Sequence, residues 1–316
     1  MKVSVYCLVY NHEKYLRDAL NGFVNQDVNF EFEVFVHDDA STDNSVQIIK
    51  EYEKKYPHII KPIYQKENKY SKGIKIFDKY IYPKMQGEYI AVCEGDDYWC
   101  DIHKLQKQVD FLDSHKNYIA CVHNTKLIDL YKNGIEIIKY DNDAERDITF
   151  ENALEGVKGS YHISSLMYRY EYGRKTPKFF DMINVGDYPM GIYLTMSGKV
   201  RYLNEVMSVY RYGTDGSWTS RTGISTLNEK INEKKQLINF YEEIKIYTNE
   251  ENCRKLDVQI LDQKIDILTI KGDFKKIKTA PYKDVFNGKS KKMKLKIFIK
   301  CVFHNSYMKY HNRRSK

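Results

Sequence analysis

The chain has 316 residues, a hydrophobic content of 42% and a formal net charge of +8. This length suits one large domain or two smaller ones, and no apolar run is long enough for a membrane-spanning helix. The N-terminus enters a strand-like run directly and lacks a signal-peptide cleavage site, so we expect a cytoplasmic protein. The six cysteines form no C-x-x-C pair, and we expect free thiols rather than zinc ligands or disulfides.

The positive charge is concentrated at the C-terminus. Residues 271–316 hold 15 Lys and Arg against 2 Asp and Glu, whereas the preceding 270 residues hold 36 against 41. A basic tail suits an anionic surface such as lipid headgroups or nucleic acid, and the alternative is a solvated terminus. The acidic body and the lack of a recognition motif disfavour nucleic acid. We therefore expect either peripheral binding to the inner face of the plasma membrane or a solvated tail.

Predicted strands alternate with predicted helices through the first 93 residues. The predicted strands are residues 3–10, 31–36, 58–64 and 88–93. The predicted helices begin near residues 15, 43 and 74, where apolar side chains recur at intervals of three and four. This alternation predicts βαβ units and a mainly parallel sheet flanked by helices, which is an α/β fold.

Two of these strands end in pairs of carboxylates, Asp38-Asp39 and Asp96-Asp97. Ligands of open α/β sheets bind at the carboxyl ends of the strands, so the pairs predict one binding site. Each pair alone is equally well explained as a turn with aspartate at favoured positions. The sequence contains neither G-x-G-x-x-G after the first strand nor a P-loop, which argues against the usual dinucleotide and P-loop sites.

The second half of the chain continues the α/β pattern and then changes. Its predicted elements are a helix at residues 101–112, a hairpin at 118–140, strands at 160–168 and 206–212, and a helix after Asp187. Beyond residue 222 the apolar spacing predicts helices only. We therefore divide the chain into a domain of residues 1–221 and a helical, basic region of residues 222–316.

Residues 291–303 are ambiguous between strand and helix. Met293, Leu295, Ile297 and Ile299 alternate as in a strand, and on a helical wheel the lysines and apolar side chains do not separate cleanly. Such a segment is also compatible with lying on an anionic membrane, with its lysines at the level of the headgroups.

Three blocks of sequence resemble a known family. They are Val9-Tyr10-Asn11, the run from Phe35 to Ser45 that contains Asp38-Asp39, and Gly87-Glu88-Tyr89-Ile90 leading to Glu94-Gly95-Asp96-Asp97. In type and spacing they are similar to the family-2 inverting glycosyltransferases of the GT-A fold. The resemblance covers roughly residues 1–220. It implies a GT-A nucleotide-diphospho-sugar transferase fold with a small C-terminal helical extension.

The resemblance also implies a donor site. Asp39 matches the residue that hydrogen-bonds uracil, Tyr10 the residue that stacks beneath the base, Asp96 the ribose or sugar contact, and Asp97 the metal ligand. The family's D-x-D motif reads here as Glu94-Gly95-Asp96 followed by Asp97, so Asp96 is the alternative ligand. The remaining implied donor contacts are Val9, Asn11, Glu13 and Lys72, with Lys69 as an alternative to Lys72. The cation implied is Mn²⁺ or Mg²⁺, which carboxylate oxygens suit better than zinc.

The second functional stretch lies around Asp187. By resemblance this residue matches the catalytic base that takes the proton of the acceptor hydroxyl, although an aspartate before a helix is also an ordinary cap. Asp181 is the fallback. The resemblance further implies acceptor or diphosphate-loop roles for His162, Arg211, Ser217 and Trp218. The alternatives are a structural role for His162 and an ordinary glycine-rich surface loop for the stretch that holds Ser217 and Trp218. Arg221 is an alternative to Arg211.

Together these features predict a metal-dependent inverting glycosyltransferase. We expect it to move a hexose or N-acetylhexosamine from a UDP-sugar to a hydroxyl of a lipid-linked saccharide in bacterial cell-surface polysaccharide or capsule synthesis. A nucleotidyltransferase is the alternative enzyme, although the glycine- and lysine-rich loop typical of that class is missing after the first strand. A carbohydrate-binding protein that keeps the fold without catalysis is the non-enzymatic alternative.

Overall fold

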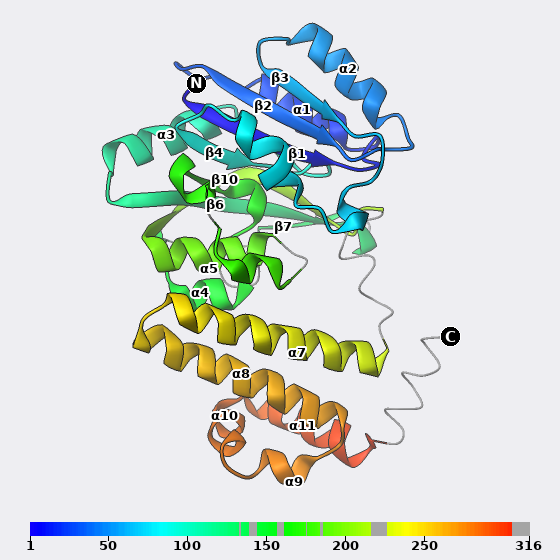
Figure 1. Ribbon diagram of the computed structural model, residues 1–316, viewed down its shortest axis with the longest axis vertical. Helices are drawn as coiled ribbons and strands as arrows, with labels where there is room; N and C mark the ends of the chain where they lie inside the picture. The colour runs from blue at the N-terminus through cyan, green and yellow to red at the C-terminus, as the bar shows by residue number, and fades with distance from the viewer. Residues whose placement is uncertain are drawn as a thin grey trace. The chain divides into compact units, whose positions relative to one another are not determined.

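The computed structural model describes residues 1–132, 134–138, 144–156, 161–174, 176–183, 186–215 and 226–304. The chain divides into two compact units (Figure 1). The first combines Met1–Thr176 with Met190–Ser220, and the second combines Pro177–Pro189 with Arg221–Lys316. Residues 177–189 thus belong to the second unit, whereas our sequence-based division at residue 221 placed them in the first domain.

The described strands of the first unit form one ten-stranded sheet. They are β1 (Val3–Val9), β2 (Phe32–Asp38), β3 (Ile60–Tyr64), β4 (Tyr89–Val92), β5 (Tyr98–Trp99), β6 (Tyr118–Asp129), β7 (Ile135–Ile138), β8 (Arg146–Ile148), β9 (Met167–Arg169) and β10 (Lys199–Tyr212). The order across the sheet is β3-β2-β1-β4-β9-β6-β10-β5, with β7 beside β6 and β8 beside β10. Strands β1 to β4 are parallel as predicted, but the sheet as a whole is mixed because β5, β7, β8 and β9 run antiparallel to their neighbours.

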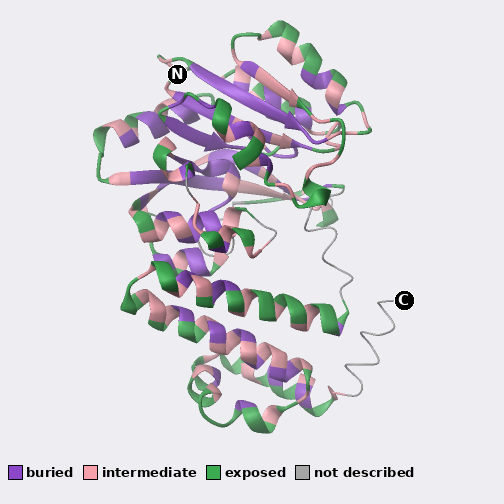
Figure 2. Cartoon of the chain, viewed as in Figure 1, coloured by how far each residue is buried: buried purple, intermediate pink, exposed green. Residues whose placement is uncertain are grey.

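Within the parallel half, β1, β2 and β4 are largely buried on both faces, which explains their apolar runs, whereas the edge strand β3 is only partly buried. Helices α1 (Leu16–Val24), α2 (Ser45–Lys55) and α3 (Lys104–Ser114) pack their apolar faces on it (Figure 2). In α1 the buried side chains Leu16, Ala19, Leu20 and Phe23 have the spacing of a single helical face. The register places the end of β1 beside the end of β2, Val9 opposite Asp38, so the loops that follow lie together.

Trp99 anchors the end of the loop that follows β4. Its ring lies edge-on to Phe23 with centroids 4.8 Å apart, and its indole N–H donates to the Ser164 carbonyl at 2.8 Å. The Nζ atom of Lys104 lies 3.7 Å from the centroid of the Trp99 ring, and burial lowers the pKa of this lysine to about 7. Trp99 comes two residues after Asp97, so this packing sets where the carboxylate loop ends.

Three predicted elements differ in detail from the structure. Residues 163–165 form a 3₁₀ turn rather than strand, because the Ser165 hydroxyl donates to the His162 carbonyl at 2.6 Å, and only Met167–Arg169 pairs as β9. Residues 77–84 form short irregular helical turns rather than one α-helix. The last strand is longer than predicted, since β10 begins at Lys199.

The second unit is helical. Its elements are α7 (Leu227–Ile244), α8 (Glu250–Ile270), α9 (Phe274–Ile277), α10 (Tyr282–Gly288) and α11 (Lys291–Val302). Thr226 and Glu229 form a capping box at α7, and the Ser290 hydroxyl caps α11. The ambiguous segment 291–303 is therefore helical over Lys291–Val302. None of the helices within the described ranges has both the length and the apolarity needed to cross a bilayer.

All six cysteines are free thiols, as predicted. Cys7, Cys93, Cys121 and Cys301 are buried, and burial raises the pKa of each thiol.

A glycine before β4 generates a stability prediction. The Gly87 N–H donates to the Ser4 hydroxyl at 2.8 Å, and a Cβ added at Gly87 would lie 2.2 Å from the Ser4 backbone nitrogen. We expect Gly87→Ala to cost about 1–3 kcal/mol of unfolding free energy, because backbone cannot yield as a side chain does. The urea unfolding midpoint measures it. Gly288→Ala is the matched control, since nothing lies within 4 Å of its added Cβ, and equal midpoints for the two variants would contradict the prediction.

Candidate functional site

The loops after β1 and β2 are tied together by backbone and side-chain hydrogen bonds. The Asp39 N–H donates to the Val9 carbonyl at 2.9 Å, and the Thr42 N–H donates to the Asn11 side-chain oxygen at 2.7 Å. Asn11 and Ala40 both adopt positive φ angles, 58° and 63°. Left-handed backbone at a non-glycine residue is uncommon and gathers at functional sites. The predicted donor residues Val9, Asn11 and Asp39 are thus brought together here.

The first carboxylate pair has two different environments. Asp38 accepts the Ser41 N–H through Oδ2 at 3.1 Å, while its buried Oδ1 has no partner among the described residues. Asp39 accepts the backbone N–H groups of Lys69 and Tyr70 at 2.7 and 2.9 Å. Asp39 therefore anchors the loop after β3, which the sequence did not indicate. Each Asp39 oxygen keeps a second lone pair for a ligand.

The second pair, Asp96 and Asp97, is buried at the end of β4. Asp97 Oδ1 accepts the Arg211 N–H at 2.9 Å, and Asp96 Oδ2 accepts the Thr214 hydroxyl at 2.8 Å. Burial raises the pKa of Asp97 well above its usual value, and the neighbouring Asp96 raises it further. A cation beside Asp97 would reverse this shift, because it stabilises the ionised carboxylate.

Gly95 lets this loop lie directly against β1. Its N–H donates to the Leu8 carbonyl at 3.0 Å, and an added Cβ would be 2.8 Å from His12 Nδ1 and 3.0 Å from Val9 Cγ2. The glycine therefore permits the close approach that brings Asp96 and Asp97 to the ends of the parallel strands.

Arg211 joins β10 to the carboxylate loop. One guanidinium nitrogen donates to the Asp96 carbonyl at 2.9 Å, and another is hydrogen-bonded to the Asp18 carboxylate. The guanidinium also lies 5.2 and 4.5 Å from the ring centroids of Tyr15 and Tyr98. These contacts engage the Arg211 side chain within the protein and hold the carboxylate loop to β10, and its role as a diphosphate contact stays a prediction.

His162 lies beside the same carboxylate. Its ring stacks on Tyr210 with centroids 4.0 Å apart, and Nδ1 is 2.8 Å from the Ser164 hydroxyl and 3.8 Å from Asp97 Oδ2. The Ser164 hydroxyl donates in turn to that of Ser208 at 3.0 Å. The structure thus places His162 next to Asp97 within a buried hydroxyl network.

Other predicted residues have different surroundings. Tyr10 is exposed, as a base-stacking residue requires. Glu13, in the loop after β1, accepts both the backbone and side-chain N–H groups of Asn44 after β2, whereas Lys72 pairs with Glu67 within its own loop. Asp187 is the first residue of α5 (Asp187–Ser197) and accepts the Tyr188 N–H at 2.8 Å. Ser217 and Trp218 lie outside the described residues, as does the alternative Arg221.

Sequence reasoning missed His12, Asp18 and Thr214. The buried His12 Nδ1 has no partner among the described residues, and burial lowers the pKa of His12 despite the nearby Asp96. Thr214 donates to Asp96, which lies 118 residues earlier in the sequence. Asp18 is hydrogen-bonded to Arg211, which lies 193 residues later. Only the position of His12 directly after the β1 block was a signal in the sequence.

The residues present fit a hard divalent cation completed by substrate. Within the described ranges, no group of three or more His, Cys, Asp and Glu side chains is arranged to hold a metal ion. Mg²⁺ and Mn²⁺ are commonly held by one or two carboxylates together with the phosphates of the substrate. Asp96 and Asp97 supply such a pair of buried carboxylates.

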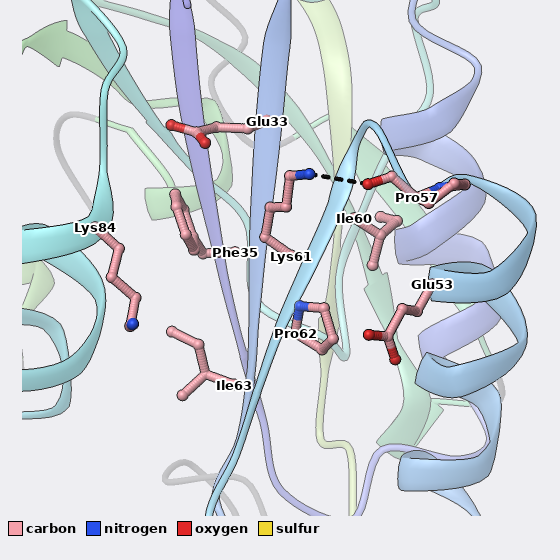
Figure 3. Close-up of a pocket in the computed structure, with 9 residues that line it drawn as sticks. All are labelled: Glu33, Phe35, Glu53, Pro57, Ile60, Lys61, Pro62, Ile63 and Lys84. Atoms are coloured by element: carbon pink, nitrogen blue, oxygen red, sulfur yellow. Dashed lines mark hydrogen bonds between the residues drawn. The ribbon is translucent and has the colours of Figure 1, made fainter.

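A cavity of about 480 Å³ beside the edge strand β3 is separate from these residues (Figure 3). It is lined by Glu33, Phe35, Glu53, Pro57, Ile60, Lys61, Pro62, Ile63 and Lys84. None of these is a predicted site residue, and Lys61 donates to the Pro57 carbonyl at its rim. We therefore assign the candidate site to the strand ends and not to this cavity.

Comparison with known proteins agrees with this fold. The family model described as glycosyl transferase family 2 matches residues 4–155. The chain thus carries a glycosyl transferase family 2 domain, and the predicted family is confirmed.

Among curated relatives, an uncharacterized protein of Mycobacterium tuberculosis (strain ATCC 25618 / H37Rv) is 35% identical over 223 residues, which are 69% of this chain and 61% of that protein. The chain therefore spans about three fifths of the length of such relatives. The minor teichoic acid biosynthesis protein GgaB of Bacillus subtilis is 26% identical over 71% of this chain and 24% of its own.

Solved structures share the fold. Staphylococcus aureus TarS 1-349 in complex with UDP-GlcNAc has a TM-score of 0.61 and 19% identity, and the match covers 95% of this chain and 79% of that one. The mannosyltransferase PcManGT of Pyrobaculum calidifontis, in complex with GDP-Man and Mn²⁺, has a TM-score of 0.55 and 14% identity over 97% and 87%. The predicted GT-A fold with a helical C-terminal region is therefore confirmed.

Asp97 generates a prediction that separates metal binding from folding. The pKa of this carboxyl is raised in the folded state above the value of 3.8 expected in the unfolded chain. The folded protein therefore loses stability as the pH rises above 3.8, because the unfolded chain ionises more easily. We expect Asp97→Asn to be more stable than wild type by about 1–3 kcal/mol at pH 7 without metal, and to lose this advantage near pH 4. Thermal unfolding at several pH values measures it.

Mn²⁺ supplies the second half of this test. We expect added Mn²⁺ to raise the melting temperature of the wild type and to leave that of Asp97→Asn nearly unchanged, because a ligand stabilises only the state that binds it. A variant that is less stable than wild type at every pH would mean that Asp97 is ionised and serves the fold instead.

Proposed function

We propose that this protein is a metal-dependent inverting glycosyltransferase that uses a UDP-sugar. The observation that carries the proposal is the buried Asp96-Asp97 pair after β4, within a glycosyl transferase family 2 domain; β4 and β2, which ends at Asp38-Asp39, lie on the two sides of β1. A cofactor-free binding protein has little reason to bury two adjacent carboxylates, since each loses hydration.

The donor binds across the ends of the parallel strands. Tyr10 offers an exposed ring to the base. Asp39 holds the loop after β3 and accepts a hydrogen bond from the edge of the base. Asp97, or Asp96 in the alternative register, would hold the Mn²⁺ or Mg²⁺ ion. When bound, this cation offsets the charge that develops on the departing nucleotide diphosphate.

Asp187 acts as the base. Displacement with inversion needs a carboxylate on the face of the sugar opposite the leaving group, where it takes the proton of the acceptor hydroxyl. Asp187 opens α5, and one of its oxygens accepts the Tyr188 N–H, which orients the carboxylate. Asp181 remains the alternative base.

The substrates follow from the relatives. TarS has been solved with UDP-GlcNAc and is named a poly(ribitol-phosphate) beta-N-acetylglucosaminyltransferase, and GgaB is named for teichoic acid biosynthesis. These names support a UDP-hexose or UDP-N-acetylhexosamine donor and a saccharide acceptor of a cell-surface polymer. We propose that the acceptor is lipid-linked and that the protein works at the cytoplasmic face of the plasma membrane.

A donor screen tests the activity. We expect Mn²⁺-dependent release of UDP from one member of a panel of UDP-sugars, suppression of the release by EDTA, and no release of GDP from GDP-mannose. Pyrophosphate release from a nucleoside triphosphate and a sugar phosphate would indicate a nucleotidyltransferase instead. Binding of saccharide without any UDP release would indicate a non-catalytic protein.

The base is tested separately from the donor site. Asp187→Asn should keep the affinity for UDP, measured by calorimetry with Mn²⁺, while sugar transfer falls about 10²–10⁴-fold through loss of proton transfer. Asp181→Asn is the matched control and should retain transfer. The opposite pattern would move the role of base to Asp181.

A further inference from the structure

Helix α11 has one face in the core of the second unit. Ile297 and Cys301 are buried in a cluster with Ile265, Leu268, Ile277 and Phe286, and partly buried Phe274 and Val285 pack against it. In Figure 1, α11 is the orange-red helix next to α8. This buried face accounts for only part of the apolar surface of α11.

A second apolar face of α11 is exposed. Leu295, Phe298, Ile299 and Val302 follow the i, i+3, i+4, i+7 spacing of one helical face, and each is between 43% and 57% exposed. We call these four residues the α11 stripe. Met293 and Phe303 add exposed apolar side chains near the two ends of the helix. At 100° per residue, the stripe is centred about 130° around the helix from Ile297 and Cys301.

Lysines border the α11 stripe. The segment from Lys291 to His304 contains five lysines and no Asp or Glu. On the helical wheel Lys292 and Lys296 fall on one side of the stripe and Lys294 on the other. Lysines in such positions reach headgroup phosphates with their amines while their stems cover apolar surface.

The lysines distinguish between the possible binding partners of the α11 stripe. A second copy docked through the same face would bring two sets of lysines together without a carboxylate on either α11. Residues 305–316 hold four Lys and Arg and no Asp or Glu, so this segment is also a poor match for a lysine-bordered face. An anionic bilayer satisfies both features at once, because it accepts apolar side chains and attracts the amines.

We propose that α11 is an interfacial helix that docks the protein on an anionic lipid bilayer, with the α11 stripe in the acyl boundary and its lysines at the headgroups. The helix lies in the plane of the membrane surface and does not cross it, in line with its 12 residues. The inference rests on α11 alone and is independent of which sugar or acceptor the protein uses.

Vesicle flotation of the full chain tests the proposal. Wild type should float with vesicles of phosphatidylcholine containing about one-third phosphatidylglycerol, and not with phosphatidylcholine alone, and added salt should weaken binding. Phe298→Ser with Ile299→Ser removes apolar area without changing charge and should lower the partition coefficient at least about tenfold. Lys292→Gln with Lys296→Gln should lower it several-fold and reduce its dependence on salt.

The matched control is Ile246→Ser with Val258→Ser. These side chains are 71% and 49% exposed in the same unit but lie outside α11, so the control should float like wild type. Far-ultraviolet circular dichroism and thermal unfolding establish that every variant is folded.

Three outcomes would overturn the proposal. They are a wild type that does not float with anionic vesicles, a Phe298/Ile299 variant that floats as well as wild type, and a control that loses binding equally. Light scattering adds a fourth, because a wild-type dimer that becomes monomeric in the Phe298/Ile299 variant would assign the stripe to a second copy.

Discussion

The burial of Asp97 is the constraint on which the site depends. Its carboxylate leaves water at the end of β4, where it accepts the backbone N–H of Arg211 and lies near His162. The Arg211 side chain then returns to the Asp96 carbonyl, so the carboxylate loop and β10 are held to each other from both directions. This closed set of contacts keeps two like charges adjacent in a place where neither is well solvated, and it gives the strand ends a standing preference for positive charge.

The predictable parts of this arrangement are those that depend only on short stretches of sequence. Strands β1, β2 and β4 follow from apolar runs, and the ends of β2 and β4 carry their carboxylates in adjacent positions. The hydrogen bonds from the Lys69 and Tyr70 N–H groups to Asp39 were not predictable. They span 30 and 31 positions of sequence and come from backbone donors, which carry no sequence signal. The same holds for Arg211, whose partner Asp18 lies 193 residues earlier.

Helix α11 shows a different limit of sequence reasoning. A helical wheel separates one apolar face from one polar face, and α11 has two apolar faces, one covered by the second unit and one exposed. Its apolar residues therefore spread around the wheel, and the alternation of Met293, Leu295, Ile297 and Ile299 resembled a strand. Burial of Ile297 with exposure of Leu295 and Ile299 resolves the ambiguity, and that information exists only in the packed structure.

The edge strand β3 has a consequence for how copies of this chain meet. An outermost strand usually presents a row of backbone donors and acceptors that a neighbouring chain can extend into a larger sheet. Pro62, opposite Val36 at the centre of the five-residue β3, has no N–H to contribute, and charged Lys61 adjoins it. These two residues interrupt the template at its midpoint, so the open edge of the sheet resists strand addition and the aggregation to which it leads.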